Sequence, residues 1–75
     1  RLGPADRPDF LIGGRIVVEV KISRAPKPGL LRQLARYASH DCVEALVLAS
    51  NTAVRLPPSI GAKPLLFVSL GRAWL

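Results

Sequence analysis

The chain has 75 residues, of which 49% are hydrophobic and 21% are charged. This length allows one small domain, residues 1–75, with a thin core, because a chain of this size buries only about 60% of its unfolded surface. The composition excludes a disordered chain. No apolar run approaches the ~20 residues of a membrane span, and the first residues do not have the pattern of a signal peptide.

Basic residues outnumber acidic ones by eleven Lys and Arg to five Asp and Glu, which gives a net charge of +6. This charge favours a polyanionic partner. Nucleic acid fits better than an acidic membrane, because no basic amphipathic helix stands alone. Small basic domains are common, however, so charge by itself does not identify the partner.

Cys42 is the only cysteine, so an internal disulfide is impossible, and no Cys/His spacing indicates zinc. We expect a reducing, cytoplasmic location, with Cys42 as a small core residue at the start of a strand. The chain lacks methionine and begins at Arg1. We therefore expect a fragment, a processed product or a trimmed chain.

A hairpin is the first predicted element. Residues 10–12 form a short apolar run, and Gly13-Gly14 is a turn signal before a second apolar run. Residues 16–22 are rich in β-branched side chains with a nearly continuous apolar start. That pattern favours a central strand covered on both faces.

Two charges interrupt this second strand. Glu19 and Lys21 are two residues apart and therefore lie on one face. An isolated pair of this kind is most simply a solvated salt bridge, whereas burial would require pairing or a bound ion. A three-residue loop of residues 13–15 would place Asp9 opposite Glu19, but a two-residue loop would place Asp9 opposite Val18. Glycines supply the positive φ that the longer loop or a bulge needs.

With the longer loop, two carboxylates lie roughly 5 Å apart at the backbone and could share one hard cation. Lys21 stands beside them. Two oxygen ligands and an adjacent ammonium suit metal-assisted hydrolysis of a phosphodiester. The metal activates water, and the lysine stabilises developing negative charge.

A helix is predicted over residues 29–39, because apolar side chains recur every three or four residues and form one stripe facing a sheet. Gln33 and Tyr37 are four residues apart and therefore neighbours on its surface, and Arg32 and Arg36 form a second such pair. Taken singly, Tyr37 is a half-buried core aromatic and Gln33 a surface residue.

The remaining elements are a loop, two strands and a connection. Residues 22–29 form a proline-containing loop whose Arg24 and Lys27 either contact phosphate or are simply solvated. Residues 43–49 form a second buried strand, parallel to the first central strand through the helix. Residues 52–63 form a loop with at most one helical turn, and residues 65–70 form the last strand.

Three further side chains have ordinary explanations. Asp6 lies in a solvated loop, or else joins a metal shell. His40 lies near the end of the helix, where the helix dipole favours it. We expect Trp74 to be a hydrophobic anchor and not a platform on which bases stack.

These motifs together resemble those of a known enzyme family. Pro8-Asp9, followed across a hairpin by Glu19-Val20-Lys21, is similar to the signature of the PD-(D/E)xK nuclease superfamily. Gln33 and Tyr37 resemble the Q-x-x-x-Y motif of its RecB-like branch. The resemblance covers residues 7–50, which are 44 of the 75 residues. It implies a restriction-endonuclease-like α/β fold with a mixed sheet and one crossover helix, without the family's N-terminal helix and first strand.

The resemblance also implies the chemistry of a Mg²⁺- or Mn²⁺-dependent deoxyribonuclease. Asp9, Glu19 and the Val20 carbonyl would hold the metal, and Lys21 would stabilise the transition state. Gln33 would orient a phosphate or a metal-bound water, and Tyr37 would brace it or touch the nucleic acid. The basic residues expected to contact nucleic acid are Arg24, Lys27, Arg32 and Arg36.

Two other readings of function stay open. One is a catalytically inactive module of the same fold that binds nucleic acid or takes part in assembly, and the other is a basic protein–protein adaptor. Because the sheet would lack the family's first strand, one edge would be exposed. We therefore expect a homodimer, or another protein segment, to complete it.

Overall fold

The computed structural model describes residues 2–3, 6–22 and 28–71, the side chain of Pro28 excepted. Two strands come first, β1 (Phe10–Ile12) and β2 (Ile16–Lys21). Helix α1 (Pro28–Ala38) follows. Three more strands complete the described part, and they are β3 (Ala45–Ser50), β4 (Ser59–Ile60) and β5 (Lys63–Ser69). None of the helices in this part is long and apolar enough to cross a membrane.

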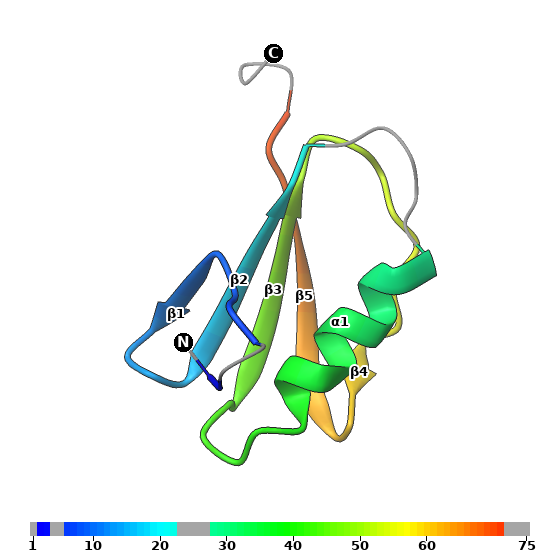
Figure 1. Cartoon of the computed structure of the whole chain (residues 1–75). Coiled ribbons are helices and arrows are strands. Elements are labelled where there is room, and N and C mark those ends of the chain that lie inside the picture. The colour runs from blue at the N-terminus through cyan, green and yellow to red at the C-terminus, as the bar shows by residue number, and fades with distance from the viewer. Residues whose placement is uncertain (1, 4–5, 23–27, 72–75) are drawn as a thin grey trace.

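The strands form a mixed five-stranded sheet in the order β1-β2-β3-β5-β4 (Figure 1). β2, β3 and β5 run parallel, and the outer strands β1 and β4 pair antiparallel. The predicted α/β class and the parallel pairing of β2 with β3 through the helix are therefore confirmed. The three parallel strands end at the same edge of the sheet, where α/β proteins commonly bind ligands.

The hairpin has the three-residue loop that the site hypothesis needs. Ile12 pairs with Ile16 and Phe10 with Val18, so residues 13–15 form the loop. Gly13 and Gly14 have φ angles of 60° and 72°, a conformation that glycine adopts without the steric cost of a Cβ. The register therefore continues toward Asp9 opposite Glu19.

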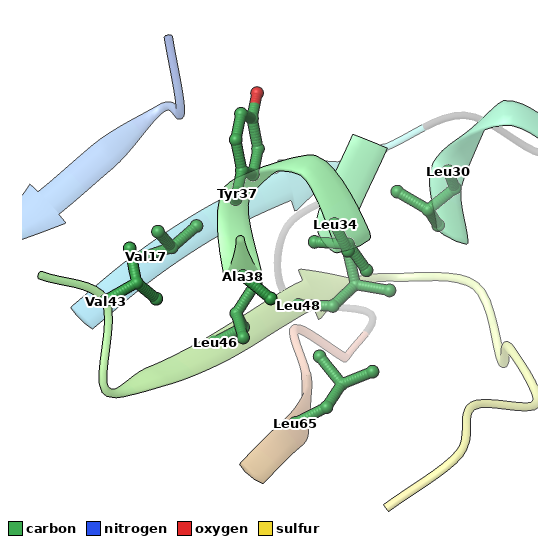
Figure 2. Packing of buried hydrophobic residues seen from close by; sticks show 9 residues of the cluster. All are labelled: Val17, Leu30, Leu34, Tyr37, Ala38, Val43, Leu46, Leu48 and Leu65. Atoms are coloured by element: carbon green, nitrogen blue, oxygen red, sulfur yellow. The ribbon is translucent and has the colours of Figure 1, made fainter. Parts of the chain in front are cut away.

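Helix α1 covers one face of the sheet and makes the core with it (Figure 2). Leu34 is fully buried and Leu30 nearly so, because their spacing places both on one face of the helix. They pack with buried strand residues from β2, β3 and β5, which are Val17, Leu46, Leu48 and Leu65. Tyr37, Ala38 and Val43 complete the buried cluster.

The other face of the sheet is not covered by the described residues, so the prediction of a central strand covered on both faces is wrong. Ile16 and Ile22 are 37% and 57% exposed, while Val17 on the helix side is fully buried. One helix can cover only one face of a sheet. The apolar runs of β2 and β5 therefore leave large hydrophobic side chains in solvent.

Two smaller predictions are also corrected. The loop expected over residues 52–63 contains β4, whose Ile60 pairs with Lys63 across a two-residue turn. Both turn residues, Gly61 and Ala62, have positive φ, as tight hairpin turns require. Cys42 is exposed and not a core residue, because it lies in the turn before β3. Trp74 lies outside the described residues.

Candidate active site

The predicted charges of β2 lie at the carboxyl end of the parallel strands, on the face that α1 covers. Val17, Glu19 and Lys21 alternate with Val18 and Val20 along the strand, so Glu19 and Lys21 share the face of the buried Val17. Glu19 is 3% exposed. The prediction that Glu19 and Lys21 share one face is confirmed, but the pair is far more buried than a solvated salt bridge.

Lys21 is the partner that balances the buried carboxylate. Its Nζ lies 3.2 Å from Oε2 of Glu19, and the two side chains are 31% and 4% exposed. The ammonium therefore reaches solvent while the carboxylate does not. Taking a carboxylate out of water is costly unless it is paired and hydrogen-bonded, which Lys21 provides from one side.

Asp9 satisfies the other oxygen of Glu19 through its backbone. The Asp9 N–H donates to Oε1 of Glu19 at 3.2 Å, and Oδ2 of Asp9 accepts from the Val20 N–H at 2.7 Å. The Asp9 carboxylate thus lies against the backbone of β2. It also borders an open groove lined by Phe10, Val20, Ile22 and Leu70. The two acids are joined through a backbone N–H, with the Asp9 carboxylate at the edge of the sheet.

Tyr37 brings the helix motif to the same place. Burial raises the pKa of the Tyr37 hydroxyl, the negative charge of Glu19 raises it further, and a hydrogen bond with the Gln33 side chain opposes both. Tyr37 is 1% exposed. Figure 2 shows its hydroxyl pointing away from the apolar cluster. Tyr37 is therefore fully buried, in place of the half-buried aromatic that its sequence position alone suggests.

The oxygen donors suit a hard cation in kind. Asp9 and Glu19 each supply a carboxylate, and Val20 lies between Glu19 and Lys21 with its carbonyl as a third oxygen. Each carboxylate oxygen has two lone pairs, so the contacts with Lys21 and with backbone N–H groups do not exhaust their capacity. The described residues contain no group of three or more His, Cys, Asp and Glu able to hold a metal ion. The predicted metal ligands include only two residues of these types, Asp9 and Glu19, and the third ligand is a backbone carbonyl.

A second polar cluster lies beside the first and was not predicted as a unit. Oδ2 of Asp6 lies 2.8 Å from Nε2 of His40, and Oδ1 accepts from Nε of Arg36 at 3.2 Å. Hydrogen bonds from His40 and then Arg36 lower the pKa of Asp6. Lys63 Nζ donates to the His40 carbonyl at 2.7 Å. The partners of Asp6 are 30 or more residues away from it along the chain, so no local sequence pattern could have paired them.

Ser50 is a further polar residue that sequence analysis did not select. It ends β3, pairs in register with Lys21 and is 1% exposed. Its Oγ accepts from the Thr52 N–H at 3.0 Å, which explains how the hydroxyl is satisfied. The sequence signal that could have selected Ser50 is its position at the carboxyl end of a strand predicted to be buried, next to the strand that carries Glu19 and Lys21.

The predicted nucleic-acid contacts are only partly described. Arg24 and Lys27 lie outside the described residues. Arg32 is exposed on α1, and Arg36 keeps 57% of its side chain exposed while it pairs with Asp6. Comparisons with protein-family models, curated proteins and solved structures gave no match for this chain.

Proposed function

We propose that the protein is a metal-dependent nuclease that hydrolyses phosphodiester bonds in DNA, with a restriction-endonuclease-like fold. One observation carries the proposal. Asp9, Glu19 and Lys21 are joined by a hydrogen bond and an ion pair, and Tyr37, which is hydrogen-bonded to Gln33 on α1, lies close enough for the charge of Glu19 to raise its pKa. The two motifs on which the resemblance rests therefore lie near each other in space, as a shared site requires.

In this proposal Lys21 is the residue that meets the phosphate. Its ammonium is the partly exposed end of the buried pair, so it can face a polyanion while Glu19 holds it in place. A charge fixed in this way needs no reorganisation as negative charge develops on the phosphate. Tyr37 and Gln33 act as positioning residues, because a hydroxyl in a 1% exposed side chain cannot touch the polymer.

Asp9, Glu19 and the Val20 carbonyl would hold Mg²⁺ or Mn²⁺. Such an ion supplies an activated water and neutralises phosphate charge. For this chain, binding would require that Asp9 turn its carboxylate from the Val20 N–H toward Glu19 and that the ion reach a Glu19 oxygen beside Lys21 or the Asp9 N–H. Asp9 would be the exposed donor and Glu19 the buried one.

The cation site can be tested without any activity. Mn²⁺ or Mg²⁺ should raise the melting temperature, because an ion that binds only the folded state stabilises it by linkage. Asp9→Asn and Glu19→Gln should abolish the rise, whereas Glu44→Gln, an exposed acid paired with Arg15, should retain it. An equal rise in the wild type and all three variants would place the ion elsewhere.

The activity is tested with supercoiled DNA in the presence of Mg²⁺, Mn²⁺ or a chelator. Wild type should nick with metal and not with chelator. Lys21→Met should slow single-turnover cleavage by about 100-fold or more, while DNA affinity changes little because one phosphate contact among several is lost. Arg32→Gln should do the opposite, lowering affinity and reducing the salt slope by about 1.

An inactive module that binds nucleic acid or takes part in assembly is the second candidate, favoured by a specific observation. Both oxygens of Glu19 already have protein partners, and the side chain is almost completely buried. Such a pair can serve the fold alone. DNA binding by wild type without cleavage in either metal would select this reading, and absence of binding in moderate salt would leave only the protein adaptor.

A further inference from the structure

The uncovered face of the sheet is a continuous apolar surface, which we call the open face. It consists of the side chains that alternate with the buried ones along β1, β2, β3 and β5. Six large members are 37–58% exposed, and they are Phe10, Ile12, Ile16, Ile22, Leu66 and Val68. Between them lie the half-buried Val18, Val20, Val47 and Leu70.

The size of the open face distinguishes it from scattered surface hydrophobics. From their exposed fractions, its six large members present about 550–600 Å², at the upper end of the roughly 300–600 Å² of the largest patch on a typical monomer. A standard protein interface buries about 800 Å² on each partner. The exposed apolar area of the open face therefore approaches the area that each copy buries in a stable dimer.

The charge distribution favours a second copy of this chain as the occupant. Apart from Asp9 at one end, no described residue that lines the open face is charged, although the whole chain carries +6. The paired charges Glu19 and Lys21 point to the helix side of the same strand. Two open faces can therefore meet without burying an unpaired charge, whereas nucleic acid would find no cation there. Two sheets pack face to face at about 10 Å when their inner side chains are apolar.

A groove at one end makes this surface uneven, so that a facing side chain has a place to insert. It has a volume of about 540 Å³ and is lined by Phe10, Val20, Ile22 and Leu70, with Asp9 as its single acid. An apolar side chain of a facing sheet could enter it. Asp9 is exposed at the rim, where its carboxylate accepts from the Val20 N–H at 2.7 Å, so this charge lies at the border of the contact and not at its centre.

We propose that the protein forms a symmetric homodimer in which the open faces of two copies pack against each other. This differs from the dimer expected at a sheet edge, because β1 offers an edge of only three residues while the open face spans four strands. In a two-fold dimer every contact occurs twice, so one substitution acts at two places. This proposal does not depend on nuclease activity, so a failure of the proposed function would leave it unaffected.

Sedimentation velocity of the full chain between about 1 and about 200 µM tests the dimer. Wild type should sediment as a dimer at tens of micromolar, at both low salt and about 1 M salt, because apolar contacts are not screened. Leu66→Glu should raise the dimer dissociation constant by at least about 100-fold, since each copy would bury an unpaired charge. Leu31→Glu is the matched control, because Leu31 is 43% exposed on α1, away from the open face, and it should leave the constant unchanged.

A second measurement covers the case in which Leu66→Glu does not fold. The melting temperature of wild type should then rise with protein concentration, as it does when folding and association are coupled. A wild-type monomer throughout the range would overturn the proposal. A dimer that survives Leu66→Glu, or one that Leu31→Glu dissociates, would also overturn it by placing the interface on another surface.

Discussion

Removing Lys21 and removing Glu19 from their ion pair should cost different amounts of stability. The Nζ–Oε2 distance is 3.2 Å, but Glu19 has 4% of its side chain exposed and Lys21 31%. Lys21→Met removes the ammonium and leaves a buried carboxylate whose remaining partner among the described residues is the Asp9 N–H. Glu19→Gln keeps an acceptor for that N–H and leaves a lysine that can turn into solvent. Removing the lysine should therefore cost more.

The magnitude follows from the geometry. Two unit charges at 3.2 Å attract by roughly 5 kcal/mol at an effective dielectric of about 20, before the cost of desolvation is subtracted. Because Lys21 is only partly desolvated, we expect Lys21→Met to lower the free energy of unfolding by about 2 kcal/mol and Glu19→Gln by about 1 kcal/mol. The double variant should recover part of the loss, with a coupling energy of about 1–2 kcal/mol.

Urea unfolding of the wild type, the two single variants and the double variant gives the coupling energy directly. Arg15 and Glu44 provide the control cycle, since their atoms are 3.7 Å apart and their side chains 68% and 64% exposed. That coupling should lie below about 0.5 kcal/mol. If the two cycles gave equal couplings, or if Glu19→Gln cost more than Lys21→Met, the burial argument would be wrong.

Three further predictions concern single groups. Tyr37 is the only tyrosine and its pKa is raised, so the folded state keeps its proton longer. Stability should therefore fall as pH rises above the ordinary value of about 10; ultraviolet titration should show tyrosinate appearing together with unfolding, and Tyr37→Phe should lose this dependence on pH. The lowered pKa of Asp6 implies a contribution to stability that is present above its ordinary value of about 4 and is lost as pH falls through the lowered folded value. Asp6→Asn should flatten the acid limb of a plot of urea midpoint against pH, and an unchanged limb would count against the Asp6 cluster. Gly14 has φ 72° and open space where a Cβ would lie, so Gly14→Val should cost about 1–2 kcal/mol by backbone strain alone. Gly14→Asn should cost clearly less, and equal costs in urea unfolding would argue against strain.

The elements that were predictable from sequence are those fixed by local rules. Loop length and two glycines set the register of the hairpin, and that register brings Asp9 to Glu19. The helical period placed Leu30, Leu34 and Tyr37 on one face, and all three are buried. These predictions needed only neighbouring residues, because backbone geometry converts spacing into position.

The parts that were missed depend on contacts distant in sequence. A period-two pattern says which strand residues share a face, but not whether a helix covers that face, so the open face could not be foreseen. The Asp6 cluster joins residues 30 or more apart. The orientation of the Asp9 carboxylate depends on a 2.7 Å bond to Val20, and the same register is equally compatible with a carboxylate turned toward Glu19. β4 was missed because two residues are too few for a periodic signal.

Strand β2 carries both surfaces on which the proposals rest. Glu19 and Lys21 face the helix, and Val18 and Val20 face the open side, so any displacement of this strand moves the two surfaces together. The Val20 N–H also anchors Asp9, whose carboxylate borders the groove of the open face. A second copy packed on Val20 would hold β2 and the Asp9 loop in place from behind, without touching the helix side. If both proposals hold, dilution to monomer should weaken cation binding at Asp9 and Glu19. The reciprocal follows by linkage, and the cation should then tighten the dimer by the same factor. Measuring the dimer dissociation constant with and without Mn²⁺ would reveal that coupling, and equal constants would show that the two surfaces of β2 act separately.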